Sequence, residues 1–381
     1  MKKQKICVIG DGLAGLMTAL VLSKSDIQID LIFKNKKVKK IKDSRTTAIS
    51  ESNYLFLSKF FKNSDLKIFN SCKNIDLYNE KSGQYQHFMN FNEQGKNLLH
   101  MVENKKLKNI ILKNIKKTKN IKIIYGTVKK LDVEKSCILI KNKKLYYDLI
   151  ALCLGRQSDI VLQLIGKRYI EDNSEEISFT GLVKHDKNII KAKQYFLKEG
   201  PLAILPINKN IFSFVWTLNR NYRKIKSQNI KKLVSQKLKS IIGSRTKISL
   251  EQPKGFPVSF KFNTNFVKKN SLVLGDSSYN VHPIAGQGFN LILRDIKKLS
   301  EFILENQSLG LQIKDSMILD KFTRSRKPEN FLYGLGINFT SRFFKHNKST
   351  SLLKEMIFKD INKFKFLKKL SLKISDQGIF P

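Results

Sequence analysis

A glycine-rich turn near the amino terminus constrains the fold of this chain more than any other sequence feature. It follows the apolar run Ile6 to Ile9, and the residues after it, Leu13 to Leu22, have helical apolar spacing. Ile27 to Phe33 then forms a second apolar run of strand length. Strand, glycine turn, helix and strand in this order predict a βαβ unit.

The turn itself reads Gly10-Asp11-Gly12-Leu13-Ala14-Gly15. Glycine at its first position permits a tight turn, at the second it lets backbone approach a pyrophosphate, and at the third it lets helix and strand pack closely. The N–H groups at the helix start favour negative charge. The unit is therefore predicted to bind a dinucleotide. The acidic residue expected near positions 33–34 to bind a ribose is replaced by Phe33 and Lys34, which predicts looser or rearranged ribose binding.

A second glycine-rich turn lies near residue 280. The predicted strand Leu272 to Leu274 ends in Gly275-Asp276, and His282-Pro283-Ile284-Ala285-Gly286-Gln287-Gly288-Phe289-Asn290 follows and opens a helix. The Asp276 carboxylate is suited to bind a ribose or ribitol hydroxyl, and the helix start is suited to an electron-rich ring. Arg45, in Asp43-Ser44-Arg45, is suited to reach a phosphate as a bidentate cation.

The remaining pattern distributes the nucleotide-binding elements along the chain. We expect a helix within 102–117 and strands at Ile121 to Val128, Cys137 to Ile140, Leu145 to Tyr147 and Leu149 to Leu154, with a turn at Asn142-Lys143. Residues 177–218 are predicted to form further strands interrupted at Pro201 and Pro206, and the pattern from about residue 288 is helical to the end. A cofactor domain that is interrupted by an inserted domain would give this order.

Charge is the unusual part of the composition. The chain has 72 Lys and Arg against 31 Asp and Glu, a net charge of +41, and such a surplus attracts anions. The lysines are spread along the whole sequence, however, and no basic cluster alternates with stacking aromatic residues. Nucleic-acid binding is therefore the least favoured function.

Length, apolar content and cysteines indicate a folded intracellular protein. With 381 residues and 41% hydrophobic residues, two or three domains are expected. The sequence has no apolar stretch of about 18 residues and no signal peptide. Its four cysteines, Cys7, Cys72, Cys137 and Cys153, form no CxxC pair, which favours buried free thiols over a zinc site, so no metal is expected.

In their order these motifs resemble those of the FAD-dependent aromatic hydroxylases, class A flavoprotein monooxygenases, and within them the ubiquinone-biosynthesis hydroxylase family. Three segments between the motifs are also similar to that family: Gly200-Pro201-Leu202-Ala203-Ile204-Leu205-Pro206, Val215-Trp216 and Phe256-Pro257. The resemblance covers about residues 5–300.

The resemblance implies an α/β fold with a Rossmann-like FAD-binding domain (a GR2-type flavoprotein), an inserted mixed β-sheet substrate domain and C-terminal helices. Residues 1–75, 101–157 and 270–330 are assigned to the FAD-binding domain and residues 76–100 and 158–269 to the substrate domain. Residues 331–381 are assigned to the C-terminal helical region.

The activity that the resemblance implies is that of an FAD-dependent monooxygenase in ubiquinone biosynthesis. It would hydroxylate the ring of a polyprenyl phenol with O2 and NAD(P)H through a flavin hydroperoxide. The implied cofactor contacts are Gly10, Gly12, Leu13, Ala14, Gly15, Arg45, Val128, Gly155, Gly275, Asp276, Pro283, Gly286, Gln287, Gly288, Phe289 and Asn290. Pro283 would lie at the reacting edge of the ring, and His282 and Tyr279 are the candidates for a base. Leu205, Pro206, Val215 and Trp216 would form the wall opposite the ring, unless Trp216 and its neighbours are sheet core.

Three positions depart from the family pattern. Lys34 stands at the ribose position, Leu154 replaces an Asp tied to FAD and nicotinamide handling, and Ser277-Ser278-Tyr279 replaces Ala-Ala-His. These changes keep an alternative open, an FAD-binding accessory or scaffold flavoprotein without hydroxylase activity.

The C-terminal residues 352–374 combine apolar residues at helical spacing with many lysines. Such a helix either contacts an anionic membrane surface or packs on the FAD domain with its lysines in solvent. The expected partners are a lipid-tailed phenol, O2, a membrane surface and proteins of quinone biosynthesis. The expected location is cytoplasmic or peripheral on the inner face of the cytoplasmic membrane.

Overall fold

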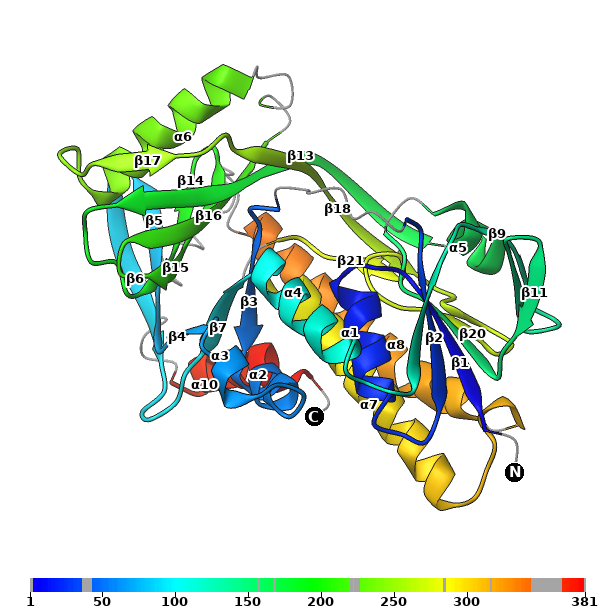
Figure 1. Ribbon diagram of the computed structural model, residues 1–381. Coiled ribbons are helices and arrows are strands. Elements are labelled where there is room, and N and C mark those ends of the chain that lie inside the picture. The colour runs from blue at the N-terminus through cyan, green and yellow to red at the C-terminus, as the bar shows by residue number, and fades with distance from the viewer. Residues whose placement is uncertain are drawn as a thin grey trace.

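The protein is described by a computed structural model. The described residues are 3–35, 43–155, 158–166, 169–219, 222, 227–283, 286–315, 317–343 and 365–379. They form two large sheets, two small sheets and several helices (Figure 1).

A six-stranded sheet contains the predicted βαβ unit. Its central strand β1 pairs in parallel with β2 and with β12, and Val8 lies between Leu31 and Ala151. All three residues are fully buried, as expected of a parallel sheet covered on both faces. In spatial order the strands are β19 (Val267–Lys268), β20 (Ser271–Val273), β12 (Leu149–Leu152), β1 (Lys5–Ile9), β2 (Gln28–Phe33) and β8 (Ile121–Tyr125).

Helices cover one face of this sheet. Helix α1 (Leu13–Leu22) packs between α4 (Asn104–Ile115) and α7 (Gly288–Ser308), and α7 runs alongside α1 in Figure 1. A three-stranded meander of β9 (Val128–Asp132), β10 (Cys137–Ile140) and β11 (Lys143–Tyr146) contributes Ile138 and Ile140 to the same core. The turn between β10 and β11 lies at Lys141-Asn142, where both residues have positive φ, one residue earlier than predicted.

The second large sheet has nine strands. β13 is its longest strand and pairs with β16, β17 and β18. β5 joins this sheet by parallel pairing with β14, although more than one hundred residues separate them. The strands are β21 (Tyr279–Asn280), β18 (Lys254–Asn263), β13 (Tyr169–His185), β16 (Ile211–Leu218), β15 (Gly200–Asn208), β14 (Ala192–Leu197), β5 (Asn74–Lys81), β6 (Gln84–Asn92) and β17 (Ile248–Leu250).

Helix α6 (Ser227–Ile242) covers the outer face of the nine-stranded sheet (Figure 1). Its buried residues Ile230, Val234 and Leu238 recur every four positions and pack on the aromatic residues of β16. A small sheet of β3 (Thr46–Ser50), β7 (Leu99–Glu103) and β4 (Asn70–Cys72) contacts β15. The other helical elements are α2 (Glu51–Ser58), α3 (Asn63–Leu66), α5 (Asp159–Ile165), the 3₁₀ turn η3 (Ile313–Asp315), α8 (Ile318–Phe343) and α10 (Lys365–Gln377).

The predicted fold class is confirmed, and α1 has the predicted bounds. The prediction that Pro201 and Pro206 interrupt strands is wrong, because both lie inside β15. Pro201 is the second residue of β15, and Pro206 adjoins a register shift between β15 and β16, two places where a strand tolerates a missing N–H. All four cysteines are free and buried, as predicted. The division of the chain into domains stays a prediction.

Candidate functional site: a glycine-lined cofactor site against a mixed sheet

The junction of β1, α1 and β12 leaves no room for side chains at two of its glycines. A Cβ atom on Gly10 would lie 2.2 Å from the backbone oxygen of Cys153, and one on Gly15 would lie 2.2 Å from the backbone oxygen of Gly10. Gly10 also has φ +139°, which favours glycine. Burial raises the pKa of Cys153 to about 12, so its thiol stays protonated and packs as a small apolar group.

Gly12 differs from both because its Cβ position is open. No atom of the described residues lies within 4 Å of that position, and Gly12 has an ordinary extended conformation, with φ −80° and ψ 174°. It is the N-cap of α1, and the first intrahelical bond runs from Leu16 N–H to the Gly12 oxygen. The N–H groups of Leu13, Ala14 and Gly15, in the first turn of α1, precede this bond and are therefore available to a ligand.

A second helix start faces the same region. Helix α7 begins at Gly288 with Gln287 as its N-cap, and its first turn has neither a side-chain cap nor an acidic residue. The buried Gln287 Oε1 atom has no hydrogen-bond partner among the described residues. Gly286 has φ +63°, and a Cβ there would lie 3.1 Å from the Cβ of Ala48. This turn therefore adjoins β3.

The side chain of Asn290 fixes α7 to β3. Its Nδ2 donates to the Ala48 oxygen (2.9 Å), and its Oδ1 accepts from the Ser50 N–H (3.0 Å). Since the amide is used in these bonds, a contact of Asn290 with a cofactor would be made through its backbone. Phe289 and Leu13 are half-buried beside the two helix starts.

The carboxyl ends of β12 and β20 complete this cofactor site. Ser277 Oγ donates to the Gly155 oxygen (2.9 Å), which ties the two strand ends together. A Cβ on Gly275, whose φ is +87°, would lie 3.2 Å from the Cβ of Ala14. The site thus lies outside the carboxyl ends of parallel strands, the usual ligand position in an open α/β sheet.

Arg45 lies at the mouth of the site and is held by Asp43. Its Nε and Nη2 atoms donate to the two carboxylate oxygens (2.9 and 2.8 Å). The hydrogen bonds that Arg45 donates to Asp43 raise the pKa of Arg45, and the nearby charge of Asp276 adds to this effect. The guanidinium carbon also lies 5.4 Å from the centre of the Phe256 ring in β18. Arg45 therefore joins the cofactor site to the nine-stranded sheet.

His282 makes a second connection to that sheet. Its Nε2 atom lies 3.2 Å from Oε2 of Glu176 in β13, and both residues are buried. The next residue, Pro283, is half-buried, and its carbonyl accepts from the Gly286 N–H (3.1 Å). Ile284 and Ala285 of the same motif lie outside the described residues.

The side chains of two predicted site residues, Tyr279 and Val128, make contacts away from the cofactor site. The Tyr279 hydroxyl donates to Asp295 Oδ2 in α7 (2.5 Å), and burial followed by the charge of Asp295 raises the pKa of Tyr279 well above its usual value. Val128 begins β9, and its side chain is buried in the core opposite Ile140. Lys34 is exposed directly after β2, so no carboxylate stands at the predicted ribose position.

The predicted wall divides between two faces of the sheet. Trp216 is fully buried on the α6 side with Phe212 and Phe214, so its place in the wall is corrected to sheet core. Val215 is on the opposite side because successive strand residues alternate. We call this opposite side the inward face, and its residues include Glu176, Ser178, Thr180, Ser213, Val215, Thr217 and Phe256.

Glu176 and Phe256 were not among the residues predicted from sequence. A signal was present, because 176–180 alternates polar Glu176, Ser178 and Thr180 with apolar residues. The alternation indicates a two-sided strand, but it does not show which side meets the cofactor. That follows only from the contacts with His282 and Arg45.

The site fits FAD on two observations. An open position at Gly12 lies at one uncapped helix start, and the unpartnered Gln287 Oε1 lies at another. Arg45 and Asp276 lie near enough to each other for their charges to interact, and these groups suit phosphate and hydroxyl groups.

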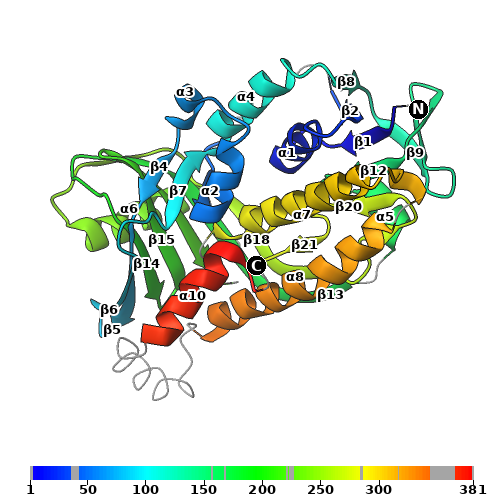
Figure 2. The ribbon, with the colours of Figure 1, turned by 90° about the horizontal axis from the view of Figure 1, so that it is seen from below.

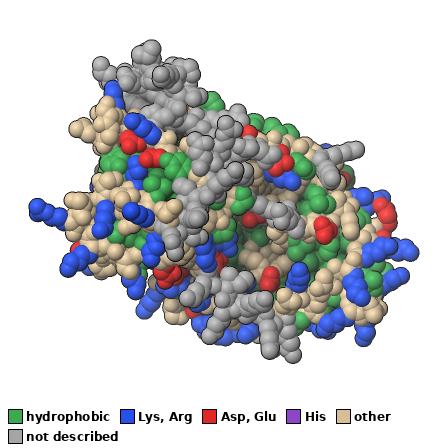
Figure 3. All heavy atoms as spheres, turned by 90° about the horizontal axis from the view of Figure 1, so that it is seen from above, with side chains coloured by type: hydrophobic (Ala, Val, Ile, Leu, Met, Phe, Trp, Pro, Cys, Tyr) green, Lys and Arg blue, Asp and Glu red, His purple; other side chains and the backbone are tan. Residues whose placement is uncertain are grey.

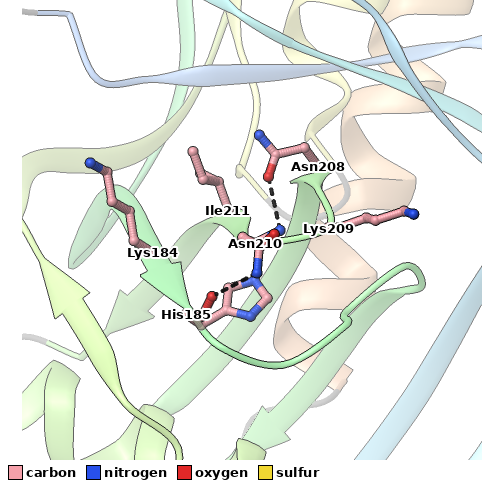
Figure 4. Close-up of a pocket in the computed structure, with 6 residues that line it drawn as sticks. All are labelled: Lys184, His185, Asn208, Lys209, Asn210 and Ile211. Carbon is pink, nitrogen blue, oxygen red and sulfur yellow. Dashed lines mark hydrogen bonds between the residues drawn. The ribbon is translucent and has the colours of Figure 1, made fainter.

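A surface pocket of about 480 Å³ lies elsewhere (Figure 4). It is lined at the end of β13 and around the β15–β16 turn by Lys184, His185, Asn208, Lys209, Asn210 and Ile211. Nine residues of extended strand, about 30 Å, separate His185 from Glu176. Hydrogen bonds from Asn210 to the His185 and Asn208 oxygens close this turn. We therefore assign the pocket to the surface of the turn and not to the cofactor site.

Comparison with known proteins agrees with this geometry. Ubiquinone biosynthesis monooxygenase COQ6, mitochondrial, of Dictyostelium discoideum is 24% identical over 90% of this chain and 84% of its own length. The crystal structure of p-nitrophenol 4-monooxygenase PnpA from Pseudomonas putida DLL-E4 superposes with a TM-score of 0.82 at 15% identity, and each chain is covered to 99%. Klebsiella pneumoniae HpxO complexed with FAD and uric acid superposes with a TM-score of 0.77 at 13% identity, covering 99% of this chain and 98% of that one.

A family model also matches. The model described as squalene epoxidase aligns with residues 178–372, just over half of the chain. That range includes the inward-face strands and the turn that opens α7. The predicted resemblance to flavoprotein monooxygenases is thereby confirmed, and the chain belongs to the squalene epoxidase family, within the FAD-dependent monooxygenases.

Proposed function

We propose that this protein hydroxylates the aromatic ring of a polyprenyl phenol in ubiquinone biosynthesis, with O2 as oxidant and NAD(P)H as electron donor. One observation carries the proposal: the cofactor site meets the inward face at two points, Arg45 on Phe256 and His282 on Glu176. The similarity to a ubiquinone biosynthesis monooxygenase supports the substrate class. FAD, when bound, supplies the oxygen-transfer chemistry.

The residues of the chain bind and orient the cofactor. The backbone at Gly12 and the start of α1 would hold the pyrophosphate, and Arg45 would add a positive charge at the mouth. The N–H groups of Gly288, Phe289 and Asn290 precede the first intrahelical bond of α7. They would stabilise negative charge on the reduced ring.

The inward face would position the phenol and exclude water from it. Ser178, Thr180 and Thr217 are each less than 10% exposed, and Ser178 and Thr217 join their hydroxyls at 2.9 Å. A buried wall with a few placed polar groups fits a small aromatic head that carries a hydroxyl. A reactive oxygen donor is also protected from hydrolysis at such a wall.

The proposal is tested by adding FAD to the purified protein and then NADH or NADPH, with and without a short-chain prenyl phenol. We expect a flavin spectrum, phenol-dependent oxidation of the nicotinamide and a product heavier by one oxygen atom. A protein that retains FAD but neither consumes NAD(P)H nor converts the phenol would be the accessory flavoprotein of the alternative hypothesis. The exposed Lys34 at the ribose position is the observation that favours this alternative.

Gly12→Val tests the cofactor assignment. Because no atom lies within 4 Å of the Gly12 Cβ position and the backbone is extended there, the variant should fold normally. Its side chain would occupy the space assigned to the pyrophosphate, so flavin retention should fall at least tenfold. Absorbance of the purified protein measures retention, and thermal unfolding of the apoprotein measures folding.

Gly336→Val is the matched control. Gly336 lies in α8, is exposed and is equally open, so this variant should keep its flavin. A Gly12→Val protein that folded and stayed fully yellow would remove the cofactor assignment.

Membrane contact is the second part of the proposal. The helices α8 and α10, on the face seen from below in Figure 2, expose large apolar side chains. Leu332, Leu335 and Phe339 recur on one side of α8, and Phe366 and Leu370 recur on one side of α10. Among the described residues, no helix combines the length and apolar character needed to cross a membrane. The predicted helix 352–374 is described only from residue 365.

Vesicle binding tests the membrane contact. We expect the protein to sediment with vesicles containing phosphatidylglycerol, because exposed apolar residues and lysines both favour an anionic surface. Phe339→Asp with Phe366→Asp should weaken binding at least tenfold. Leu309→Asp, at the end of α7 and 64% exposed, is the control and should bind normally. Equal binding by the wild type and the double variant would contradict this surface.

A further inference from the structure

We infer that Glu176 is a positioning residue that holds His282 as the acceptor of the phenol hydroxyl proton. The inference rests on the proposed function and adds to it a proton transfer and the residue that supports it. It starts from the contact between Glu176 Oε2 and His282 Nε2 at 3.2 Å.

The burial of this pair is the first argument. Glu176 is 4% exposed and His282 is 3% exposed. A buried carboxylate is costly unless it is paired, and apolar residues would pack at this contact at lower cost. This pair joins β13 to the segment that follows β21, next to the cofactor site, and has the arrangement of an imidazole oriented by a carboxylate.

The local backbone supplies the second argument. From Asp172 to Glu176 β13 advances four residues, while its partner β18 goes back only two, from Phe260 to Val258. Such a bulge redirects the side chains that follow it and is common beside active sites. Glu176 is the first residue of β13 that pairs with β18 after this irregularity, and it lies on the same face as Ser178 and Thr180.

The position of His282 supplies the third argument. It directly precedes Pro283 and the turn that opens α7, where the reacting ring is assigned. The other charged groups placed at the site are Asp43, Arg45, Lys254 and Asp276. Both oxygens of Asp43 accept hydrogen bonds from Arg45, Asp276 lies near the same guanidinium, and the cations Arg45 and Lys254 accept no proton. The imidazole is therefore the group suited to accept a proton beside the ring.

The proton transfer balances without a further reactant. The O–H bond of the phenol breaks, its electron pair stays on the phenol oxygen, and the proton forms an N–H bond on the imidazole. Glu176 then faces an imidazolium and stabilises it. The phenolate is more electron-rich than the phenol and reacts more readily with an electrophilic oxygen.

A binding experiment tests the transfer without turnover. The oxidised holoprotein is titrated with p-nitrophenol at a pH below the pKa of the free phenol, and the yellow phenolate is read in the difference spectrum. We expect phenolate to form on the wild type and to fall at least tenfold in Glu176→Gln, with partial recovery in Glu176→Asp. Glu171→Gln, an exposed position on the same strand, should behave like the wild type. Equal phenolate on the wild type and Glu176→Gln, or none on the wild type, would overturn the inference.

Turnover separates this inference from the proposed function. Glu176→Gln should lower kcat about a hundredfold, as loss of general base catalysis does, while KM and FAD content change less than threefold. His282→Gln should lose as much, and the double variant should lose no more than either single variant. If the losses of kcat in the two single variants multiply in the double variant, Glu176 and His282 act independently, which would contradict the inference. If Glu176→Gln does not fold, Glu176→Asp and His282→Gln decide in its place. A wild type that ionises the probe but converts no phenol would refute the hydroxylase and leave the proton acceptor standing.

Discussion

The two faces of the nine-stranded sheet are made by the same strands and carry different chemistry. On the α6 side, β16 places Phe212, Phe214 and Trp216, all fully buried against the helix. On the inward face, β16 places Ser213, Val215 and Thr217. Since neighbouring residues of a strand point in opposite directions, a single strand builds a packed core and a reaction surface at once.

The difference shows where stability and function are separated in this protein. Large side chains on the α6 side fill space closely, and a Cβ on Gly181 would lie 3.1 Å from the Phe214 ring. The inward face instead combines hydroxyl residues and the Glu176 carboxylate with Val215 and Phe256, which gives less close packing but offers polar contacts. A substitution on the α6 side should therefore change unfolding, and one on the inward face should change chemistry.

Trp216→Ala is expected to have the largest effect on stability. It removes a fully buried indole and the hydrogen bond from Nε1 to the Gly200 oxygen (3.2 Å). Truncating a buried Trp costs about 3–5 kcal/mol, so the urea midpoint should fall steeply. The protein that remains folded should keep its FAD and its kcat, because the indole points away from the cofactor site.

Val215→Ala is the matched control on the inward face. Val215 is half-buried, and its truncation should cost about 1 kcal/mol. Equal losses of stability in Trp216→Ala and Val215→Ala would mean that the two faces contribute equally to the stability of the fold.

The same contrast explains how much of the fold the sequence could predict. The β1–α1–β2 unit was predicted nearly to the residue, because a glycine turn, a buried run and helical spacing are all local signals. The pairing of β5 with β14 was not predicted, since that contact joins segments more than one hundred residues apart.

The candidate site shows the same limit. The proposed role of Gly10, Gly12 and Gly15 can be predicted from their local spacing in the sequence. The proposed role of Glu176 depends on its contact with His282, which is 106 positions away in the sequence. The family resemblance implies either a wall position or a sheet-core position for Trp216, and the sequence alone does not decide between them. Alternation reveals which residues share a face, but packing of α6 decides which face is core.

The distribution of charged side chains over the surface could also not be predicted from the sequence. In Figure 3, which shows the molecule from above, Lys and Arg side chains are scattered over the surface with acidic and hydrophobic residues between them. Scattered lysines give long-range attraction to anions without the aligned contacts that a nucleic-acid site needs. This view agrees with the prediction that nucleic-acid binding is the least favoured function.

The smallest effect on stability is expected for Ser213→Ala. Whether this variant raises or lowers the free energy of unfolding is the most sensitive test of the difference between the two faces. Ser213 is fully buried on the inward face, and its Oγ atom has no hydrogen-bond partner among the described residues. Ser178 lies on the same face with its hydroxyl paired to Thr217. Because an unpaired buried hydroxyl is unfavourable and a paired one is favourable, Ser213→Ala should raise the free energy of unfolding by about 1 kcal/mol and Ser178→Ala should lower it by a similar amount.

Urea unfolding of the two alanine variants measures both changes. Only Ser178→Ala should also raise KM for the phenol, since Ser178 lies one alternation from Glu176 on β13, whereas Ser213 lies opposite Leu205 near the β3–β7–β4 sheet. A loss of stability in Ser213→Ala would show that its hydroxyl has a partner in solution. The inward face would then be held together by polar contacts along its whole width, and the separation between a packed face and a reacting face would be narrower than the arrangement of side chains indicates.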